Sequence, residues 1–144
     1  MAAARLSWQL RLAWRLHRWL YALSGGRIGT TINGMPVLML RTRGRRSGDQ
    51  RTVGLQYLAV GSACVVIASF VGEERQPAWL LNLRADPAAT VRRGRREERV
   101  RAREAGGEER EALWQRIVAI DPAFAEYQRR TSRRIPVVLL EPVE

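Results

Sequence analysis

The sequence predicts a mainly β protein of the α+β class, folded as a small antiparallel barrel with few helices. Two observations predict this class. Apolar segments rich in β-branched residues, each long enough for one strand, recur between residues 36 and 70 and again at 135–140, and turn-forming residues separate them. The helical patterns are few and do not alternate with single strands, which argues against a parallel α/β sheet.

The first half of the predicted barrel contains three strands. Pro36 to Thr42 is the first, and Arg51 to Val60 is the second. Gly61-Ser62 predicts a tight turn into a third strand, Ala63 to Phe70, whose valines and isoleucine suit a buried position. These three strands form the start of an antiparallel sheet.

The second half mixes helices with the remaining strands. A polar loop over 72–77 leads into a short helix that begins at Pro77, because proline fits the first turn of a helix. The other expected elements are hairpin strands over Ala89–Arg93 and Glu98–Arg103, helices over Glu108–Ile120 and Ala123–Arg130, and a closing strand over Ile135–Leu140.

Residues 1–24 predict an N-terminal amphipathic helical arm, which Gly25-Gly26 separates from a barrel domain over 25–144. Between Arg5 and Leu23, leucines and tryptophans recur at helical spacing, while arginines line another face. Such a helix can lie on an anionic membrane surface, or it can cover its own domain or a second subunit. Both alternatives stay open at this point.

Composition limits the possible functions. The 144 residues fit one domain, and the net charge of +11 comes from a chain without lysine. This charge predicts attraction to anions but does not choose among them. A nucleic-acid partner is not expected, because aromatic residues do not interleave with the basic strand residues as stacking platforms would.

Cys64 is the sole cysteine and lies in an apolar run, so we expect a buried thiol and no disulfide within the chain. His17 is the sole histidine, so neither a histidine metal cluster nor a Ser-His-Asp triad can form, and no metal is expected. The chain has no apolar run of about 18 residues for a membrane span. These observations predict a cytoplasmic protein.

The segment Thr42–Thr52 carries the strongest functional signal. It joins two predicted strands and contains Gly44, Gly48 and four arginines. Glycines let backbone N–H groups converge on one point, and arginines offer paired hydrogen bonds to phosphate or carboxylate. A solvated hairpin loop is the alternative. The spacing matches neither the triphosphate-binding loop nor the dinucleotide-binding fingerprint. The segment therefore predicts a site for a strongly anionic ligand.

Six segments of the chain, taken together and in order, are typical of one protein family. They are Gly34–Val37, Thr42–Gly48, Val66–Ser69, Pro77–Leu83, Tyr127–Thr131 and Ile135–Pro142. In this order they resemble the deazaflavin-dependent nitroreductase and quinone reductase family of actinobacteria. The resemblance covers the chain from Gly25 to its end and implies a split β-barrel of the FMN-binding, flavin-reductase type that binds reduced coenzyme F-420, an 8-hydroxy-5-deazaflavin.

The resemblance also implies positions for the cofactor. The arginine loop would hold the phosphate and the start of the polyglutamate tail, and two strand ends would border the deazaflavin ring. The implied binding residues are Arg45, Arg46, Ser47, Gly48 and Arg51 for the anionic end, and Thr52, Val53, Gly54, Ala68, Ser69, Trp79 and Asn82 around the ring. A core position is the alternative for Trp79.

On the acceptor side the chain departs from the family pattern. Members known as nitroreductases carry tyrosines at the positions of Gln56, Asp121 and Phe124, and only Tyr127 remains here. A basic residue common at Phe70 and a glycine at Val71 are also absent. We expect a remodelled substrate pocket at Gln56, Phe124 and Tyr127, with Tyr127 and Ser69 as the candidate catalytic residues.

The resulting hypothesis is an oxidoreductase that transfers a hydride from reduced coenzyme F-420 to a small acceptor: a quinone, an activated alkene or a nitroaromatic compound. The arm at residues 5–23 would then place it at the inner face of the membrane. The alternative is a non-catalytic cofactor- or lipid-binding barrel. FMN is an alternative cofactor, since one phosphate also fits the arginine loop. The oligomeric state and the physiological acceptor stay open.

Overall fold

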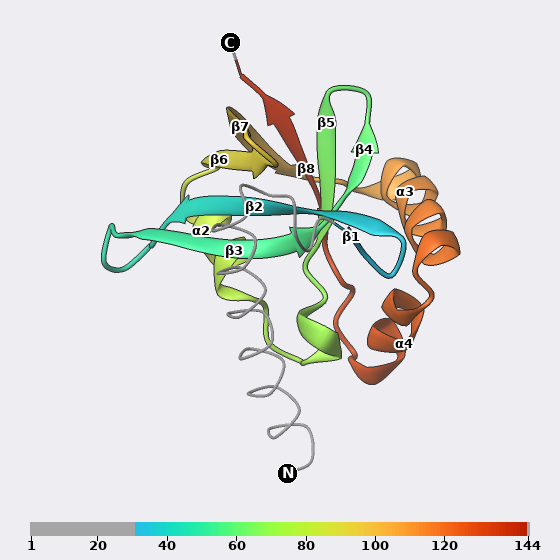
Figure 1. Cartoon of the computed structure of the whole chain (residues 1–144). Coiled ribbons are helices and arrows are strands. Elements are labelled where there is room, and N and C mark those ends of the chain that lie inside the picture. Colours follow the sequence, from blue (N-terminus) through green and yellow to red (C-terminus); the bar gives the residue numbers. More distant parts are fainter. Residues whose placement is uncertain (1–30, 144) are drawn as a thin grey trace.

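The computed structural model describes residues 31–143, and the expected arm at residues 1–24 lies outside them (Figure 1). Within the described part, strands and short helices alternate irregularly along the chain. The elements are β1 (Thr31–Ile32), β2 (Met35–Arg43), β3 (Gln50–Gln56), β4 (Leu58–Val60), β5 (Ala63–Ile67), the 3-10 turn η1 (Phe70–Gly72), α2 (Ala78–Ala85), β6 (Ala88–Arg93), β7 (Arg96–Glu104), α3 (Gly107–Ile120), α4 (Ala123–Arg130) and β8 (Val137–Pro142).

The strands form one antiparallel sheet that curves into a half-barrel. Its order is β1-β2-β6-β7-β8-β5-β4, and β3 pairs with β2 off this path. The long strand β2 is the branch point, because Leu40 lies opposite Val53 of β3 and also opposite Val91 of β6. Helix α2 lies against one end of β2, while α3 and α4 stand together at the opposite side of the sheet (Figure 1).

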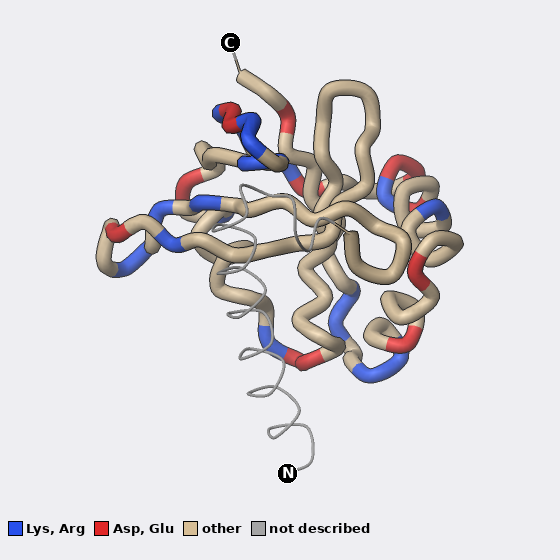
Figure 2. Tube along the Cα trace, in the orientation of Figure 1, with Lys and Arg blue, Asp and Glu red and all other residues tan. Residues whose placement is uncertain are grey.

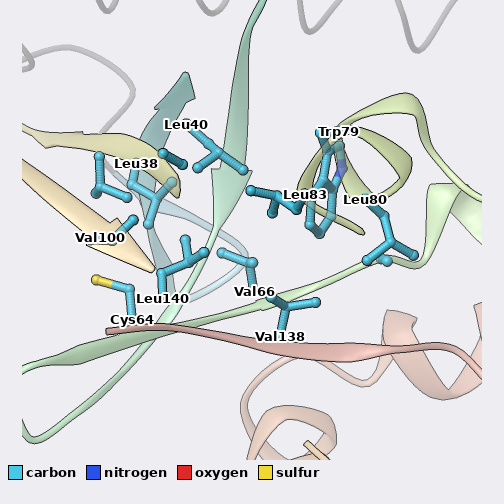
Figure 3. Packing of buried hydrophobic residues seen from close by; sticks show 13 residues of the cluster. Leu38, Leu40, Cys64, Val66, Trp79, Leu80, Leu83, Val100, Val138 and Leu140 are labelled. Carbon is cyan, nitrogen blue, oxygen red and sulfur yellow. The ribbon is translucent and has the colours of Figure 1, made fainter. Parts of the chain in front are cut away.

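Two hydrophobic clusters fill the two faces of the central strands. In β5 and β8 successive residues alternate between them: Cys64 and Val66 join one cluster, and Val65 and Ile67 join the other. Residues 63–67 of β5 and 137–140 of β8 are apolar at every position because both faces of the sheet are covered there. The first, the barrel cluster, brings β2, β5, β7, β8 and α2 together (Figure 3). The second, the helix cluster, lies under α3 and α4.

The structure confirms most of the predicted elements and corrects two strands. The strand expected over 51–60 is two strands, because the chain leaves β2 after Gln56 and then pairs with β5. The strand expected over 63–70 ends at Ile67. Phe70 instead enters η1, where its φ is +43°. This backbone region is incompatible with a strand.

The other boundaries differ by a few residues. The closing strand begins at Val137 and not at Ile135, since the Ile135 N–H donates to the Gln128 side chain. The hairpin β6–β7 is longer than expected, as Arg93 pairs directly with Arg96. The short strand β1 was not predicted. Among residues 31–143, no helix has both the length and the apolar character to cross a membrane.

Candidate functional site

The β2–β3 hairpin holds its arginines on a tightly folded backbone. The Gly44 N–H donates to the Asp49 carbonyl at 2.7 Å, and the Gly48 N–H donates to the Gly44 carbonyl at 2.8 Å. A side chain at Gly44 would place its Cβ 2.9 Å from the Ser47 Oγ, and Gly48 has a φ of +77°. Both glycines are therefore required by the shape of the loop.

Hydrogen bonds to the side chain of Asn82 in α2 connect this loop to the core. Its Oδ1 accepts hydrogen bonds from the backbone N–H of Arg45 at 3.1 Å and from Arg45 Nη1 at 3.2 Å. Its Nδ2 donates to the Thr42 Oγ1 at 3.2 Å. Asn82 and Thr42 are only 4% and 1% exposed. The buried amide thus uses both of its ends to fix the position of Arg45.

The other arginines of the loop face solvent. Arg43, Arg46 and Arg51 are exposed, and none forms an ion pair within residues 31–143. Figure 2 shows the loop as a protruding charged tip in which Asp49 is the one acidic residue. The Ser47 Oγ accepts a hydrogen bond from the Asp49 N–H at 3.1 Å. The loop therefore offers guanidinium donors whose hydrogen-bonding capacity is largely unused.

Strand β3 follows this loop and contains three of the predicted ring-binding residues. Thr52, Val53 and Gly54 lie opposite Arg41, Leu40 and Met39 of β2. Gly54 is buried, and Val53 packs on the barrel cluster. Strand β3 also contacts β5, after which Ala68 and Ser69 follow.

Trp79 occupies a core position. It is 8% exposed and belongs to the barrel cluster, where it lies beside Leu80 and Leu83 of the same helix (Figure 3). This burial agrees with the alternative raised for Trp79 in the sequence. A direct contact between its indole and a cofactor stays a prediction.

At the other end of β3, a hydrogen-bonded polar pair, the half-buried Gln56 and the buried Asp121, occupies the predicted acceptor side. Gln56 Nε2 donates to Asp121 Oδ2 at 2.9 Å and to the Ile32 carbonyl at 2.9 Å. The Ala123 N–H donates to Asp121 Oδ1 at 3.1 Å, and Asp121 is 4% exposed. Two departures from the family pattern therefore form one hydrogen-bonded unit.

The aromatic residues of the acceptor side come from α4. The rings of Phe124 and Tyr127 meet edge to face, with centroids 5.8 Å apart. Burial raises the pKa of Tyr127, the Asp121 carboxylate raises it further, and Arg130 opposes the shift. A phenol of ordinary or raised pKa is protonated at neutral pH, so the Tyr127 hydroxyl carries its proton there.

The structure places the arginine loop at the start of β3 and joins Gln56, at the end of this strand, to Asp121, which precedes the helix that carries Phe124 and Tyr127. The sequence did not reveal the links that hold them: Asn82 to Arg45, Gln56 to Asp121, and Arg133 to the segment that follows β5. Each link joins residues far apart in the chain. In a chain so rich in arginine, nothing distinguishes Arg133 by composition.

A comparison with protein families decides the identity. The model of the family described as F420H(2)-dependent quinone reductase matches residues 13–142. The chain belongs to this family. An F420H(2)-dependent quinone reductase of Mycobacterium tuberculosis (strain H37Rv) is 39% identical over 131 residues, which cover 88% of this chain and 87% of that protein. Membership confirms the predicted family, an oxidoreductase class, and coenzyme F-420 as the cofactor.

Solved structures agree with this family. An F420-H2 dependent reductase, FDR-A, superposes with a TM-score of 0.68 at 36% identity, over 74% of this chain and 94% of that chain. Another solved structure, described as a domain-swapped dimer, has a TM-score of 0.70 at 34% identity, over 88% of this chain and 94% of that chain. The half-barrel of this F420H(2)-dependent quinone reductase family member is thus the split β-barrel that was predicted.

Proposed function

We propose that this chain transfers a hydride from reduced coenzyme F-420 to a quinone, with the cofactor laid along β3. The proposal rests on the path of strand β3 through the fold. It begins at the arginine loop and ends at Gln56, beside the group formed by Asp121, Phe124 and Tyr127. Family membership supports both the cofactor and the acceptor class.

The donors along β3 fit the chemistry of this cofactor. Its phosphodiester and polyglutamate tail are anionic, and Arg45, Arg46 and Arg51 supply guanidinium groups on a backbone that Asn82 fixes. Charge-assisted pairs of this kind are the strong hydrogen bonds of proteins. The seven residues of β3 span about 20 Å at ~3.3 Å per residue. A ligand with an anionic end and a distant ring matches this length.

On the ring side, apolar and small residues would border the flat deazaflavin. Val53 and Gly54 lie on β3, and Ala68 and Ser69 follow β5. Gly54 is buried in the sheet and has no side chain, so the backbone there can come close to a planar group. We assign these residues, with Thr52, to the ring end of the cofactor site.

When bound, the reduced cofactor supplies a hydride to the acceptor. Reduction of a quinone to a hydroquinone takes one hydride and one proton, so the protein must orient the acceptor and deliver a proton to its oxygen. Tyr127 is the proposed proton donor, because its phenol stays protonated beside the buried Asp121. Ser69 directly precedes η1, which packs against α4, and is the second proposed polar contact to the acceptor, while Phe124 supports the Tyr127 ring.

The proposal is tested by following the oxidation of reduced F-420 in the presence of a water-soluble menaquinone analogue. Tyr127→Phe should lower kcat by about 10- to 100-fold and leave cofactor affinity nearly unchanged. Because the pKa of Tyr127 is raised above its usual value near 10, the phenol stays protonated between pH 6 and 9, and its loss should reduce kcat equally across that range. Equal losses of kcat and cofactor affinity would remove this role from Tyr127.

Long-tailed quinones reside in membranes, so we also propose that residues 5–23 bind the inner membrane surface, as their tryptophans and arginines suggest. The full chain should sediment with anionic liposomes, and a chain starting at Gly25 should not. Equal sedimentation of both chains would exclude the arm from membrane binding.

A further inference from the structure

One guanidinium holds the segment that links β5 to α2. Arg133 lies between α4 and β8 and is half-buried. Its Nη2 donates to the Ser69 carbonyl at 2.8 Å, and its Nη1 donates to the Ala68 carbonyl at 3.1 Å and to Gln76 Oε1 at 2.8 Å. Its Nε donates to the Glu73 carbonyl at 2.8 Å. A single side chain therefore fixes both ends of this segment.

The residues between those contacts form a turn in an unfavourable backbone region, which we name the left-handed turn (Phe70–Gly72). Its φ angles are +43° for Phe70, +55° for Val71 and +79° for Gly72. A β-branched residue such as Val71 is strongly disfavoured there. The turn contains a hydrogen bond from the Gly72 N–H to the Ser69 carbonyl at 2.9 Å. Strained turns persist only where their surroundings fix them, and Arg133 binds that same carbonyl.

The left-handed turn packs directly against α4, without space for a side chain between them. A Cβ added at Gly72 would lie 2.6 Å from the Tyr127 carbonyl oxygen and 2.9 Å from the Arg130 Cβ. No side chain fits between the turn and the helix. The position of the turn thus sets how closely Tyr127 approaches the segment that carries Ser69.

Arg133 is itself held in place. The side chain of Gln128 in α4 donates to the Arg133 carbonyl at 2.8 Å and accepts from the Ile135 N–H at 3.0 Å. Burial lowers the pKa of Arg133, and the carboxylates of Glu74 and Glu73 oppose that shift. A guanidinium nevertheless stays protonated in proteins. The contact to the Ser69 carbonyl is therefore charge-assisted.

We propose that Arg133 is a positioning residue that sets the separation of Ser69 and Tyr127 by holding the left-handed turn. The inference rests on the proposed function, which gives Ser69 and Tyr127 their roles toward the acceptor. Arg133 acts through the backbone of Ala68 and Ser69. Without it the turn relaxes, and the acceptor loses its alignment with the cofactor ring.

The test compares Arg133→Lys with a matched control, Glu74→Gln. The lysine keeps the charge but cannot make the forked set of hydrogen bonds. Glu74 links the same two segments by accepting from the Ser132 N–H and Oγ, both at 2.8 Å, without contacting Ala68 or Ser69. Amide hydrogen exchange of Gly72 and Glu73 is measured without ligand, and kcat and the KM for reduced F-420 are measured with the quinone analogue.

For Arg133→Lys we expect exchange at Gly72 and Glu73 to accelerate about 10-fold or more. We expect kcat to fall about 10-fold or more while the KM for the cofactor changes less than about threefold. For Glu74→Gln, exchange and kcat should both stay within about twofold of wild type.

Unchanged exchange in Arg133→Lys would overturn the proposal, as would faster exchange with an unchanged kcat. An equal loss of kcat in Glu74→Gln would show that breaking any contact between the two segments has the same effect, so that Arg133 has no specific role, which also overturns the proposal. If the wild type does not oxidise reduced F-420, the proposed function fails. The ligand-free exchange measurement then still decides whether Arg133 holds the turn.

Discussion

The two ends of β3 use polar groups in opposite ways. At the arginine loop, one buried amide fixes the backbone, and the guanidinium groups of Arg46 and Arg51 remain exposed without an ion pair among the described residues. At the other end, Gln56 and Asp121 bond to each other and are buried or half-buried. The first end leaves its guanidinium donors exposed, and the second uses its polar groups within the protein.

This difference separates two parts of recognition. The proposed function assigns recognition of the anionic cofactor to the charge and hydrogen-bond donors of the loop, so that end should govern cofactor affinity. The far end offers the aromatic rings of Phe124 and Tyr127, and with them the Tyr127 phenol. It should govern which acceptors react, mostly through shape and apolar contact. Substitutions at the two ends should therefore change different quantities: cofactor affinity at the loop and acceptor choice at the far end.

The largest effect is expected at the loop. Arg45→Ala combined with Arg46→Ala should weaken F-420 binding by about 100-fold, because two charge-assisted hydrogen bonds are lost. Fluorescence titration measures the affinity. The control is Arg101→Ala combined with Arg116→Ala, which removes two exposed arginines of β7 and α3. An equal loss in the control would mean that total charge, and not the loop, attracts the cofactor.

The next effect concerns the anchor of the loop. Asn82→Ala should weaken F-420 binding by about 10-fold, since Arg45 loses its fixed position. It should also lower the free energy of unfolding by about 1–3 kcal/mol, because the buried Thr42 hydroxyl loses its partner. Both quantities follow from titration and urea denaturation.

Thr42→Val provides the matched control for Asn82, as it removes the hydroxyl but leaves the Arg45 contacts. We expect lower stability with cofactor affinity within about twofold of wild type. If Thr42→Val weakened binding as much as Asn82→Ala, the contacts to Arg45 would not be what positions the loop.

The sequence was sufficient for the elements whose pattern is local. The strand over 36–42, the glycines of the arginine loop and the helices before Asp121 and Thr131 all follow from short-range spacing. The loop was predicted as an anion site because glycine and arginine requirements act within a few residues.

The remaining features depend on contacts between distant residues. Val71 is β-branched and favours a strand by propensity, yet it lies in the left-handed turn. Arg133 holds this turn by donating to the carbonyl of Ser69, which lies 64 residues away in the chain. Gln56 and Asp121 are 65 residues apart. Composition and periodicity carry no information about which polar residues meet, so these links required the structure.

The smallest effect is expected at the acceptor end. Gln56→Leu removes one donor from the buried Asp121 carboxylate and should lower the free energy of unfolding by about 1–3 kcal/mol. F-420 affinity should stay within about twofold, while the ratio of kcat values for quinone and nitroaromatic acceptors should change. Gln115→Leu, an exposed change on α3, is the control. A large loss of F-420 affinity in Gln56→Leu would contradict the separation of the two ends.

The most direct test of the account is a fluorescence titration of the wild-type chain with coenzyme F-420, with FMN and haem titrated in parallel. We predict micromolar or tighter binding of F-420 and at least about 10-fold weaker binding of FMN, because FMN lacks the anionic tail that the exposed arginines would hold. Equal or tighter binding of FMN or haem would contradict the account, since the arginine loop would then not select the deazaflavin.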